Sequence, residues 1–180
     1  MPGVELIAIQ SDGQLARAGE EGELRAKAPQ LMLGYLDSEL DADAFDENGY
    51  FRTGDLGVID NDGYVVISGR LKDVIIRHGE NISAKEVEDL LFQHPAVQDV
   101  AVIGLSDEVT GERACAVLST NEGTAPLTIE EMKTYLDEAG LRRNAIPEQL
   151  EIIDSIPRNP SGKITKNVLK DQFKNSDFKR

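Results

Sequence analysis

Short strand-like runs of apolar and polar residues, separated by turn signals, fill the first third of the chain. Residues 4–9 and 22–27 are two such runs, and a Ser-Asp-Gly turn follows the first of them. Residues 51–57 and 64–69 are two more, and they flank an Asn-Asp-Gly cluster that is typical of a tight hairpin turn. Strands joined by tight turns pair antiparallel, so we predict a small antiparallel β unit over residues 1–71, shaped as a distorted barrel.

Beyond this unit the pattern changes to β-branched runs that alternate with helical periodicity. Ser83 is followed by Glu86, which is the spacing of a helix capping box. Thr128 and Glu131 repeat that spacing, and a helix is predicted after each pair. The predicted strands and a short C-terminal helix are residues 73–77, 97–103, 113–119, 150–153 and 165–173. They predict a compact α+β domain over residues 72–180, so the fold class of the chain is α+β.

The charge of the chain limits its partners. It has 19 basic and 33 acidic residues, for a formal net charge of −14. Such an excess of negative charge is unfavourable for a surface that binds nucleic acid or anionic membranes. We therefore expect no nucleic-acid partner, and any anionic ligand must bind where the few cations gather.

The cysteine content and the lack of long apolar runs indicate the compartment. Cys115 is the single cysteine and lies in an apolar run, so we expect a buried, unreactive core residue in a reducing compartment. No apolar run approaches the ~18 residues of a transmembrane helix, and no signal peptide is visible. These features predict a soluble, cytoplasmic protein without a transmembrane segment.

Three short motifs contain the candidate functional residues. They are Tyr50-Phe51-Arg52-Thr53-Gly54-Asp55-Leu56-Gly57, Gly69-Arg70-Leu71-Lys72-Asp73 and Asn159-Pro160-Ser161-Gly162-Lys163-Ile164. Each is common by itself, because Ser-Gly-Lys occurs in many solvated turns. Together, in this order and at this approximate spacing, they resemble the closing third of an AMP-forming acyl-CoA synthetase. That superfamily of adenylate-forming enzymes also includes nonribosomal peptide adenylation domains and luciferases.

The resemblance implies a division of the chain and an activity. Residues 1–71 would be the distal β-barrel part of an N-terminal adenylation domain, and residues 72–180 the mobile C-terminal lid domain. The whole enzyme would join a carboxylic or fatty acid to AMP from ATP and then transfer the acyl group to coenzyme A. In the family the phosphate loop, the adenine-binding segment and the acyl pocket precede the position of Gly22. We therefore expect this chain to be part of a longer protein and to be inactive alone.

Lys163 is the candidate catalytic residue. Adenylation brings a carboxylate to the α-phosphate of ATP, and a mobile ammonium group can neutralise the charge that develops between the two anions. The resemblance gives Lys163 this role. The residues alone leave open an ordinary lysine in a turn that precedes a helix.

Asp55, Arg70 and Lys72 are candidates for nucleotide binding and for a hinge. A carboxylate at Asp55 can accept hydrogen bonds from ribose hydroxyls. The resemblance assigns Asp55 to the ribose and Arg70 to the ribose or phosphate of ATP and AMP. The alternative is a surface ion pair that contributes little stability. The role of Lys72 as the hinge is implied by the resemblance alone.

The segment around Gly79, Glu80 and Asn81 resembles the loop that lines the pantetheine channel for coenzyme A. His78 could act as a general base, but relatives often have glycine there, so we expect a partly exposed, non-catalytic side chain. Arg142 and Arg143 are the local candidates for the phosphates of coenzyme A. No histidine has metal-ligand spacing, so no metal site is predicted, and Mg²⁺ would arrive with ATP and be held mainly by phosphates and by segments outside the chain.

Three classes of function fit the sequence. The first is a carboxylate:CoA ligase, and the second is an adenylation domain that loads a carrier protein. The third is a non-catalytic binding module, for which loss of Lys163 or Asp55 would have been the sign, and both residues are present. The identity of the acid and the oligomeric state are not set by these residues.

Overall fold

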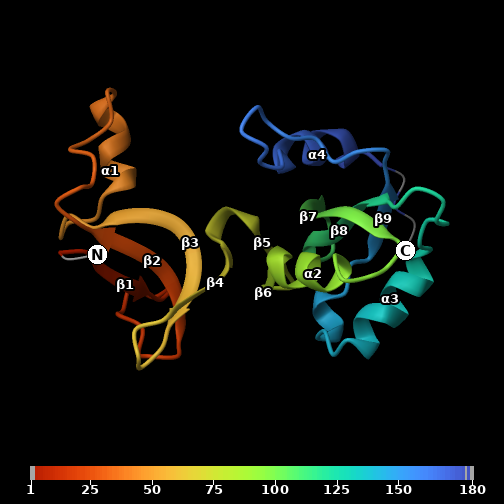
Figure 1. Ribbon diagram of the computed structural model, residues 1–180, viewed down its shortest axis with the longest axis horizontal. Helices are drawn as coiled ribbons and strands as arrows, with labels where there is room; N and C mark the ends of the chain where they lie inside the picture. Colours follow the sequence, from red (N-terminus) through yellow and green to blue (C-terminus); the bar gives the residue numbers. More distant parts are fainter. Residues whose placement is uncertain (1–2, 177, 179–180) are drawn as a thin grey trace. The chain divides into compact units, whose positions relative to one another are not determined.

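The computed structural model describes residues 3–176 and 178 and divides into two compact units, Met1–Lys72 and Asp73–Arg180. The division predicted from the sequence, after residue 71, falls one residue earlier. Residues 1–2, 177 and 179–180 belong to the predicted domains but lie outside the described part. Each unit has its own sheet (Figure 1). Among the described residues, no helix is both long and apolar enough to span a bilayer.

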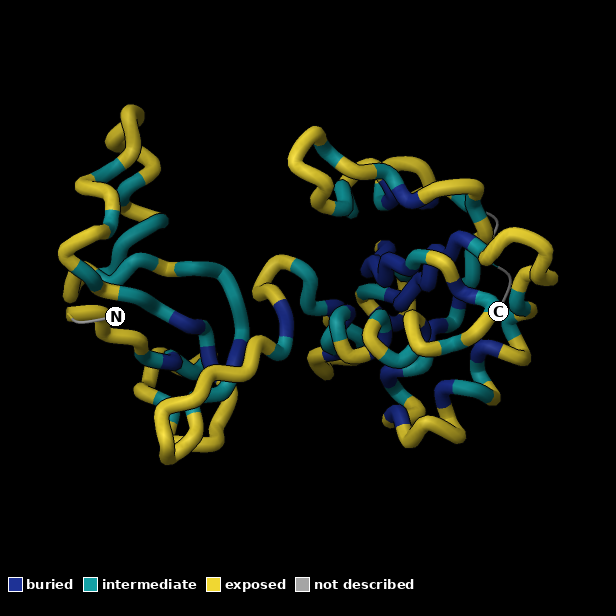
Figure 2. The backbone as a smooth tube through the Cα atoms, in the orientation of Figure 1, coloured by how far each residue is buried: buried dark blue, intermediate teal, exposed yellow. Residues whose placement is uncertain are grey.

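The first unit is built on a four-stranded antiparallel sheet. Its strands are β1 (Glu5–Ile9), β2 (Glu21–Lys27), β3 (Phe51–Ile59) and β4 (Val65–Arg70), in the spatial order β1-β2-β3-β4. The antiparallel unit expected from the sequence is present, but its sheet is open at β1 and β4 rather than closed as a barrel. Few of its side chains are fully buried, among them Ala8 and Leu24, and several apolar residues of β4 are exposed (Figure 2).

The acidic segment between β2 and β3 contains two short helical turns that the sequence did not predict. These are η1 (Ser38–Leu40) and α1 (Asp41–Ala44). Asp46 closes the segment by accepting hydrogen bonds from the backbone of Asn48 and Tyr50 and from the guanidinium of Arg25. Desolvation is the largest single influence on its pKa and raises it, but hydrogen bonds from Tyr50, Arg25 and Asn48 outweigh this, and the pKa is lowered.

The second unit is a sheet with helices on both faces. Its strands are β5 (Val74–Arg77), β6 (Glu80–Ser83), β7 (Val97–Asp107), β8 (Gly111–Thr120) and β9 (Gln149–Ile152). The order is β6-β5-β8-β7, and β9 pairs with β8 in parallel. The helices are α2 (Ala84–Leu91), α3 (Ile129–Glu138) and α4 (Lys166–Phe173), with the 3-10 turn η3 (Arg143–Ala145). Another 3-10 turn, η2 (Leu71–Asp73), includes the last two residues of the first unit and the first residue of the second. The α+β fold class predicted from the sequence is confirmed.

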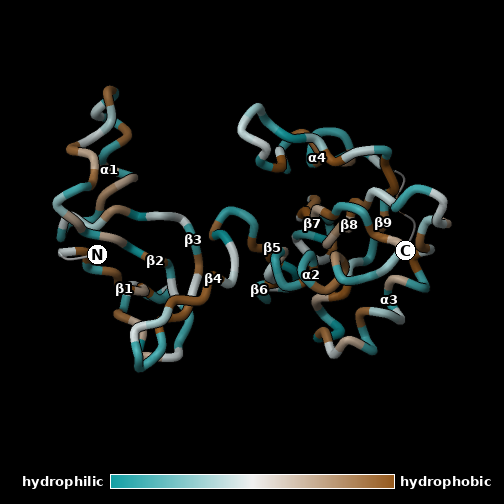
Figure 3. Tube along the Cα trace, in the orientation of Figure 1, coloured by the Kyte–Doolittle hydropathy of each residue, from teal (hydrophilic) through white to brown (hydrophobic). Residues whose placement is uncertain are grey.

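Strands β7 and β8 are buried on both faces, which explains their nearly continuous apolar sequence (Figure 3). Alternate residues such as Val100 and Val102 pack with α2 and α3 in one cluster. The residues between them, such as Ala101 and Ile103, pack with Leu169 of α4 in a second cluster. The sheet therefore positions α4, and with it the segment that precedes α4, on the face opposite α2 and α3 (Figure 1).

The stretch 77–82, interpreted from the sequence as a loop, is a hairpin formed by β5 and β6. Its two-residue turn, His78 and Gly79, has positive φ at both positions, 51° and 79°. This is the backbone of a type I′ turn, whose twist suits a tight hairpin. Strand β6 is short and polar, with only Ile82 buried, so its sequence carries no alternating signal.

Cys115 lies in β8 with none of its surface exposed, as expected from its apolar neighbours. Burial, with a smaller effect from Glu151, raises the pKa of its thiol to about 12. At pH 8 the reactive thiolate would then be on the order of 10⁻⁴ of the total. We predict negligible labelling of the folded chain by a thiol reagent and rapid labelling in denaturant. Rapid labelling without denaturant would contradict the buried position.

Candidate functional site

Lys163 lies in a tight hairpin between β9 and α4, which we call the lysine hairpin (residues 158–164). An isolated bridge between Arg158 and Ile164 closes its base. Inside it, the Lys163 N–H donates to Asn159 Oδ1 at 2.9 Å, and the Asn159 N–H donates to the Lys163 carbonyl at 2.9 Å. The Lys163 residue is exposed, so the hairpin presents a cation on a backbone that is already ordered.

Gly162 has a conformational reason to be glycine. Its φ is +81°, in the left-handed region that other residues rarely adopt. A Cβ at this position would meet no atom within 4 Å, so the described residues do not crowd it. The backbone turn therefore requires Gly162.

Lys166, at the start of α4, forms an ion-pair network that the sequence reasoning missed. Its Nζ lies 2.8 Å from Glu88 Oε1 of α2 and 3.6 Å from Asp73 Oδ2 of η2. Glu88 Oε1 also accepts a hydrogen bond from the Val102 N–H of β7. A lysine in the first turn of a helix is unfavourable for the helix dipole, and this was the available signal that Lys166 has acidic partners.

Asp55 and Arg70 come together across the β3–β4 hairpin. They are register partners, and Arg70 Nε lies 2.7 Å from Asp55 Oδ1. Their side chains are 33% and 45% exposed, so both remain accessible to a ligand. The β3–β4 register shifts immediately after Leu56, and such irregularities often redirect side chains near functional sites.

Lys72 is exposed and lies in the 3-10 turn η2. It is the last residue of the first compact unit. A position between two compact units is where a hinge would be located, and the hinge role stays a prediction.

The β5–β6 hairpin carries the other predicted binding residues. Gly79, Glu80 and Asn81 are all exposed. Glu80 accepts a hydrogen bond from the Asn144 side chain, which ties the hairpin to η3. The His78 N–H donates to the Thr110 carbonyl, and His78 is exposed.

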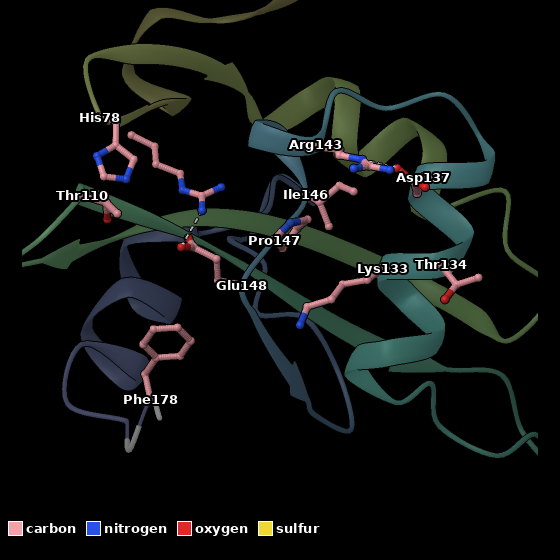
Figure 4. Close-up of a pocket in the computed structure, with 11 residues that line it drawn as sticks. His78, Thr110, Lys133, Thr134, Asp137, Arg143, Ile146, Pro147, Glu148 and Phe178 are labelled. Carbon is pink, nitrogen blue, oxygen red and sulfur yellow. Dashed lines mark hydrogen bonds and ion pairs between the residues drawn. The ribbon is translucent and has the colours of Figure 1, made fainter. Parts of the chain in front are cut away.

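A pocket of about 690 Å³ lies beside this hairpin (Figure 4). Arg77 borders it and pairs with Glu148 at 2.8 Å, yet Arg77 Nε and Glu148 Oε2 are buried and have no hydrogen-bond partner among the described residues. Arg143 lines the pocket and pairs with Asp137 at 3.3 Å. The other lining residues are His78, Thr110, Lys133, Thr134, Ile146, Pro147 and Phe178. The pocket is therefore lined by polar groups and by cations that already have carboxylate partners.

Two other residues, Arg142 and His94, do not line this pocket. Arg142 lies 3.9 Å from Glu86 at an exposed position. His94 accepts a hydrogen bond from the Ala96 N–H and packs edge-on against Tyr135. Among the described residues, no three His, Cys, Asp or Glu side chains gather so as to hold a metal ion.

Comparison with known proteins finds a matching family and similar proteins. The family described as AMP-binding enzyme C-terminal domain matches residues 86–163. The chain is 40% identical over 169 residues to the medium-chain fatty-acid–CoA ligase of Escherichia coli K12, covering 93% of this chain and 30% of that protein. It is 41% identical over 170 residues to the vibriobactin-specific 2,3-dihydroxybenzoate-AMP ligase of Vibrio cholerae, covering 94% of this chain and 31% of that protein.

Solved structures agree with these relatives. ATP-bound MatB from Rhodopseudomonas palustris matches with a TM-score of 0.89 and 33% identity, over 97% of this chain and 35% of that chain. The o-succinylbenzoate CoA synthetase of Bacillus subtilis, in complex with its acyl-adenylate intermediate, matches with a TM-score of 0.84 and 37% identity, over 94% of this chain and 34% of that chain. The chain thus spans less than a third of the length of the curated relatives described above.

Proposed function

We propose that the whole protein is an ATP-dependent, AMP-forming carboxylate:CoA ligase. The premise is that the chain belongs to the adenylate-forming superfamily of acyl-CoA synthetases and adenylation enzymes, because it matches the C-terminal part of their members. It would form an acyl-AMP and then an acyl-CoA. The observation that carries the proposal is the exposed Lys163 on an ordered hairpin within this family's fold.

In the first half-reaction, Lys163 would neutralise the charge that develops between the acid and the α-phosphate of ATP. An ammonium on a four-carbon stem can contact both groups. Its hairpin is fixed by backbone bonds, so little reorganisation is needed during the reaction. Asp55 would accept hydrogen bonds from the ribose, and Arg70 would orient that carboxylate and contact the ribose or phosphate.

In the second half-reaction, rotation about Lys72 would present the β5–β6 hairpin. Gly79, Glu80 and Asn81 would then line the channel for the pantetheine arm of coenzyme A. Arg143 and, from outside the pocket, Arg142 would contact its phosphates. The cations that line the pocket, Arg77, Lys133 and Arg143, support an anionic ligand there.

Mg²⁺ would accompany ATP, and the described residues do not fit a metal site of their own. We therefore assign its binding to the phosphates and to segments outside this chain, and no step here depends on it. A cytoplasmic location, which suits ATP and coenzyme A as substrates, remains part of the proposal.

A second candidate is an enzyme that loads a carrier protein. The 41% identity to a 2,3-dihydroxybenzoate-AMP ligase favours it as much as the 40% identity to a fatty-acid–CoA ligase favours the first. The two are separated by supplying the whole protein with acyl-adenylate and either coenzyme A or a phosphopantetheinyl carrier. Turnover with coenzyme A supports the ligase, turnover with the carrier alone supports the alternative, and binding without either reaction supports a non-catalytic module.

We predict that the 180-residue chain alone does not activate acids. It carries Lys163, but it spans only 30–31% of its relatives' length. Pyrophosphate exchange with a panel of fatty and aromatic acids should stay at background for the chain and rise above it for the whole protein. Exchange by the purified chain would show that these 180 residues contain a complete site.

A further inference from the structure

Arg158 joins the lysine hairpin to strand β7. Its Nη1 donates to the Gly162 carbonyl at 2.7 Å, and its Nη2 lies 2.7 Å from Asp99 Oδ2. The Gly162 carbonyl belongs to the peptide bond that leads into Lys163. One guanidinium therefore connects the peptide before Lys163 to a carboxylate on the central sheet.

Asp99 is itself held in place. Its Oδ1 accepts a hydrogen bond from the Val100 N–H at 3.0 Å. The register between β7 and β8 shifts between Val97 and Asp99, which marks a bulge. Bulges redirect side chains and are common beside functional sites. Asp99 is 23% exposed at its side chain, so its position is set by the sheet more than by solvent.

The contact is better suited to directing the hairpin than to stabilising the fold. The Arg158 side chain is 45% exposed, and ion pairs of this kind contribute little to global stability. The hairpin also has bonds of its own, since the Lys163 N–H donates to Asn159 Oδ1 and the Thr165 N–H donates to the Pro157 carbonyl. Without Arg158 the hairpin would persist, but its direction relative to β7 would be less defined.

We propose that Arg158 is a positioning residue for Lys163, acting through the Gly162 carbonyl and oriented by its ion pair with Asp99. This inference rests on the proposed function, because it requires Lys163 to act in adenylation. A planar guanidinium can make both contacts in a fixed geometry, whereas a lysine ammonium at the same position is a single point charge.

The test in the whole protein compares Arg158→Gln, Arg158→Lys and Asp99→Asn in the two half-reactions. We expect Arg158→Gln to lower kcat for adenylation about tenfold, with the KM values for ATP and acid little changed, because misplacing a catalytic group costs rate. Thioester formation from supplied acyl-adenylate should be unchanged. Arg158→Lys should recover part of the rate, and Arg158→Gln combined with Asp99→Asn should be no worse than Arg158→Gln alone.

A second measurement needs no activity. In the 180-residue chain, the ¹⁵N order parameters of Gly162 and Lys163 should fall in Arg158→Gln while the thermal midpoint stays unchanged. Lys85→Gln, which removes an exposed ion pair with Asp89 on α2, is the matched control and should alter neither. Unchanged adenylation or unchanged order parameters in Arg158→Gln would overturn the inference, as would equal loss in both half-reactions. If the wild-type protein adenylates no acid, the proposed function fails, and the order parameters still decide whether Arg158 fixes the hairpin.

Discussion

Replacing Lys163 with alanine in the whole enzyme is expected to lower acyl-adenylate formation by about 10²- to 10³-fold, the usual cost of losing a group that stabilises transition-state charge. Thioester formation from supplied acyl-adenylate should change little, because the role proposed for Lys163 is confined to the adenylation half-reaction. The hairpin should survive the change, since its bonds use the backbone of Lys163 and the side chain of Asn159. Pyrophosphate exchange and single-turnover thioester formation measure the two steps separately.

Two variants control this result. Lys163→Arg keeps the charge but replaces a compact ammonium by a planar group, and it should recover only part of the rate. Lys174→Ala removes an exposed lysine that pairs with Asp171, and it should leave both half-reactions unchanged. An equal loss of both half-reactions in Lys163→Ala would contradict the assigned role.

The fold was predictable where local chemistry determines an element. Thr128 and Glu131 form the capping box that their spacing predicted, with the Thr128 hydroxyl accepting from the Glu131 N–H and the Glu131 carboxylate accepting from the Thr128 N–H. The Thr128 backbone hydrogen bond is the leading reason why the pKa of Glu131 is lowered. Strands β7 and β8 were found because burial on both faces gives long apolar runs.

Elements held by polar contacts were not predictable in this way. Strand β6 has one buried residue, and its pairing with β5 depends on the His78–Gly79 turn rather than on hydrophobic alternation. The turns η1 and α1 lie in an acidic stretch without buried residues. In such segments the pattern of apolar residues carries no signal, because no face is directed to a core.

Some contacts of the candidate site could likewise be predicted from the sequence, and others could not. The Asp55–Arg70 pair could be anticipated, because a hairpin turn between two predicted strands brings residues of this separation into register. The contacts of Arg158 with Asp99 and of Lys166 with Glu88 join residues 59 and 78 positions apart. No local spacing encodes such pairs, so only the packing of α4 against β7 and the ion pair of Lys166 with Glu88 reveal what surrounds the lysine hairpin.

The proposed hinge gives the last prediction, which concerns Lys72→Pro in the whole protein. Proline fixes φ near −65° and removes an N–H, so it restricts rotation at a pivot. Asp73 is held in the second unit by the ammonium of Lys166, at 3.6 Å, so the proposed rotation would occur at the residues before it. We therefore expect thioester formation to fall on the order of 10²-fold, while adenylation is retained if the starting orientation is retained.

Lys72→Ala is the matched control, because it removes the same side chain without restricting the backbone. If the backbone is the pivot, Lys72→Ala should keep both half-reactions near wild type, and only the proline variant should separate them. Rapid-quench measurement of acyl-AMP and acyl-CoA within one turnover would show acyl-AMP accumulating in Lys72→Pro. Unchanged turnover in the proline variant would place the pivot elsewhere in the chain. Equal losses in the alanine and proline variants would instead assign the effect to the exposed ammonium group, with no role for backbone rotation at this residue.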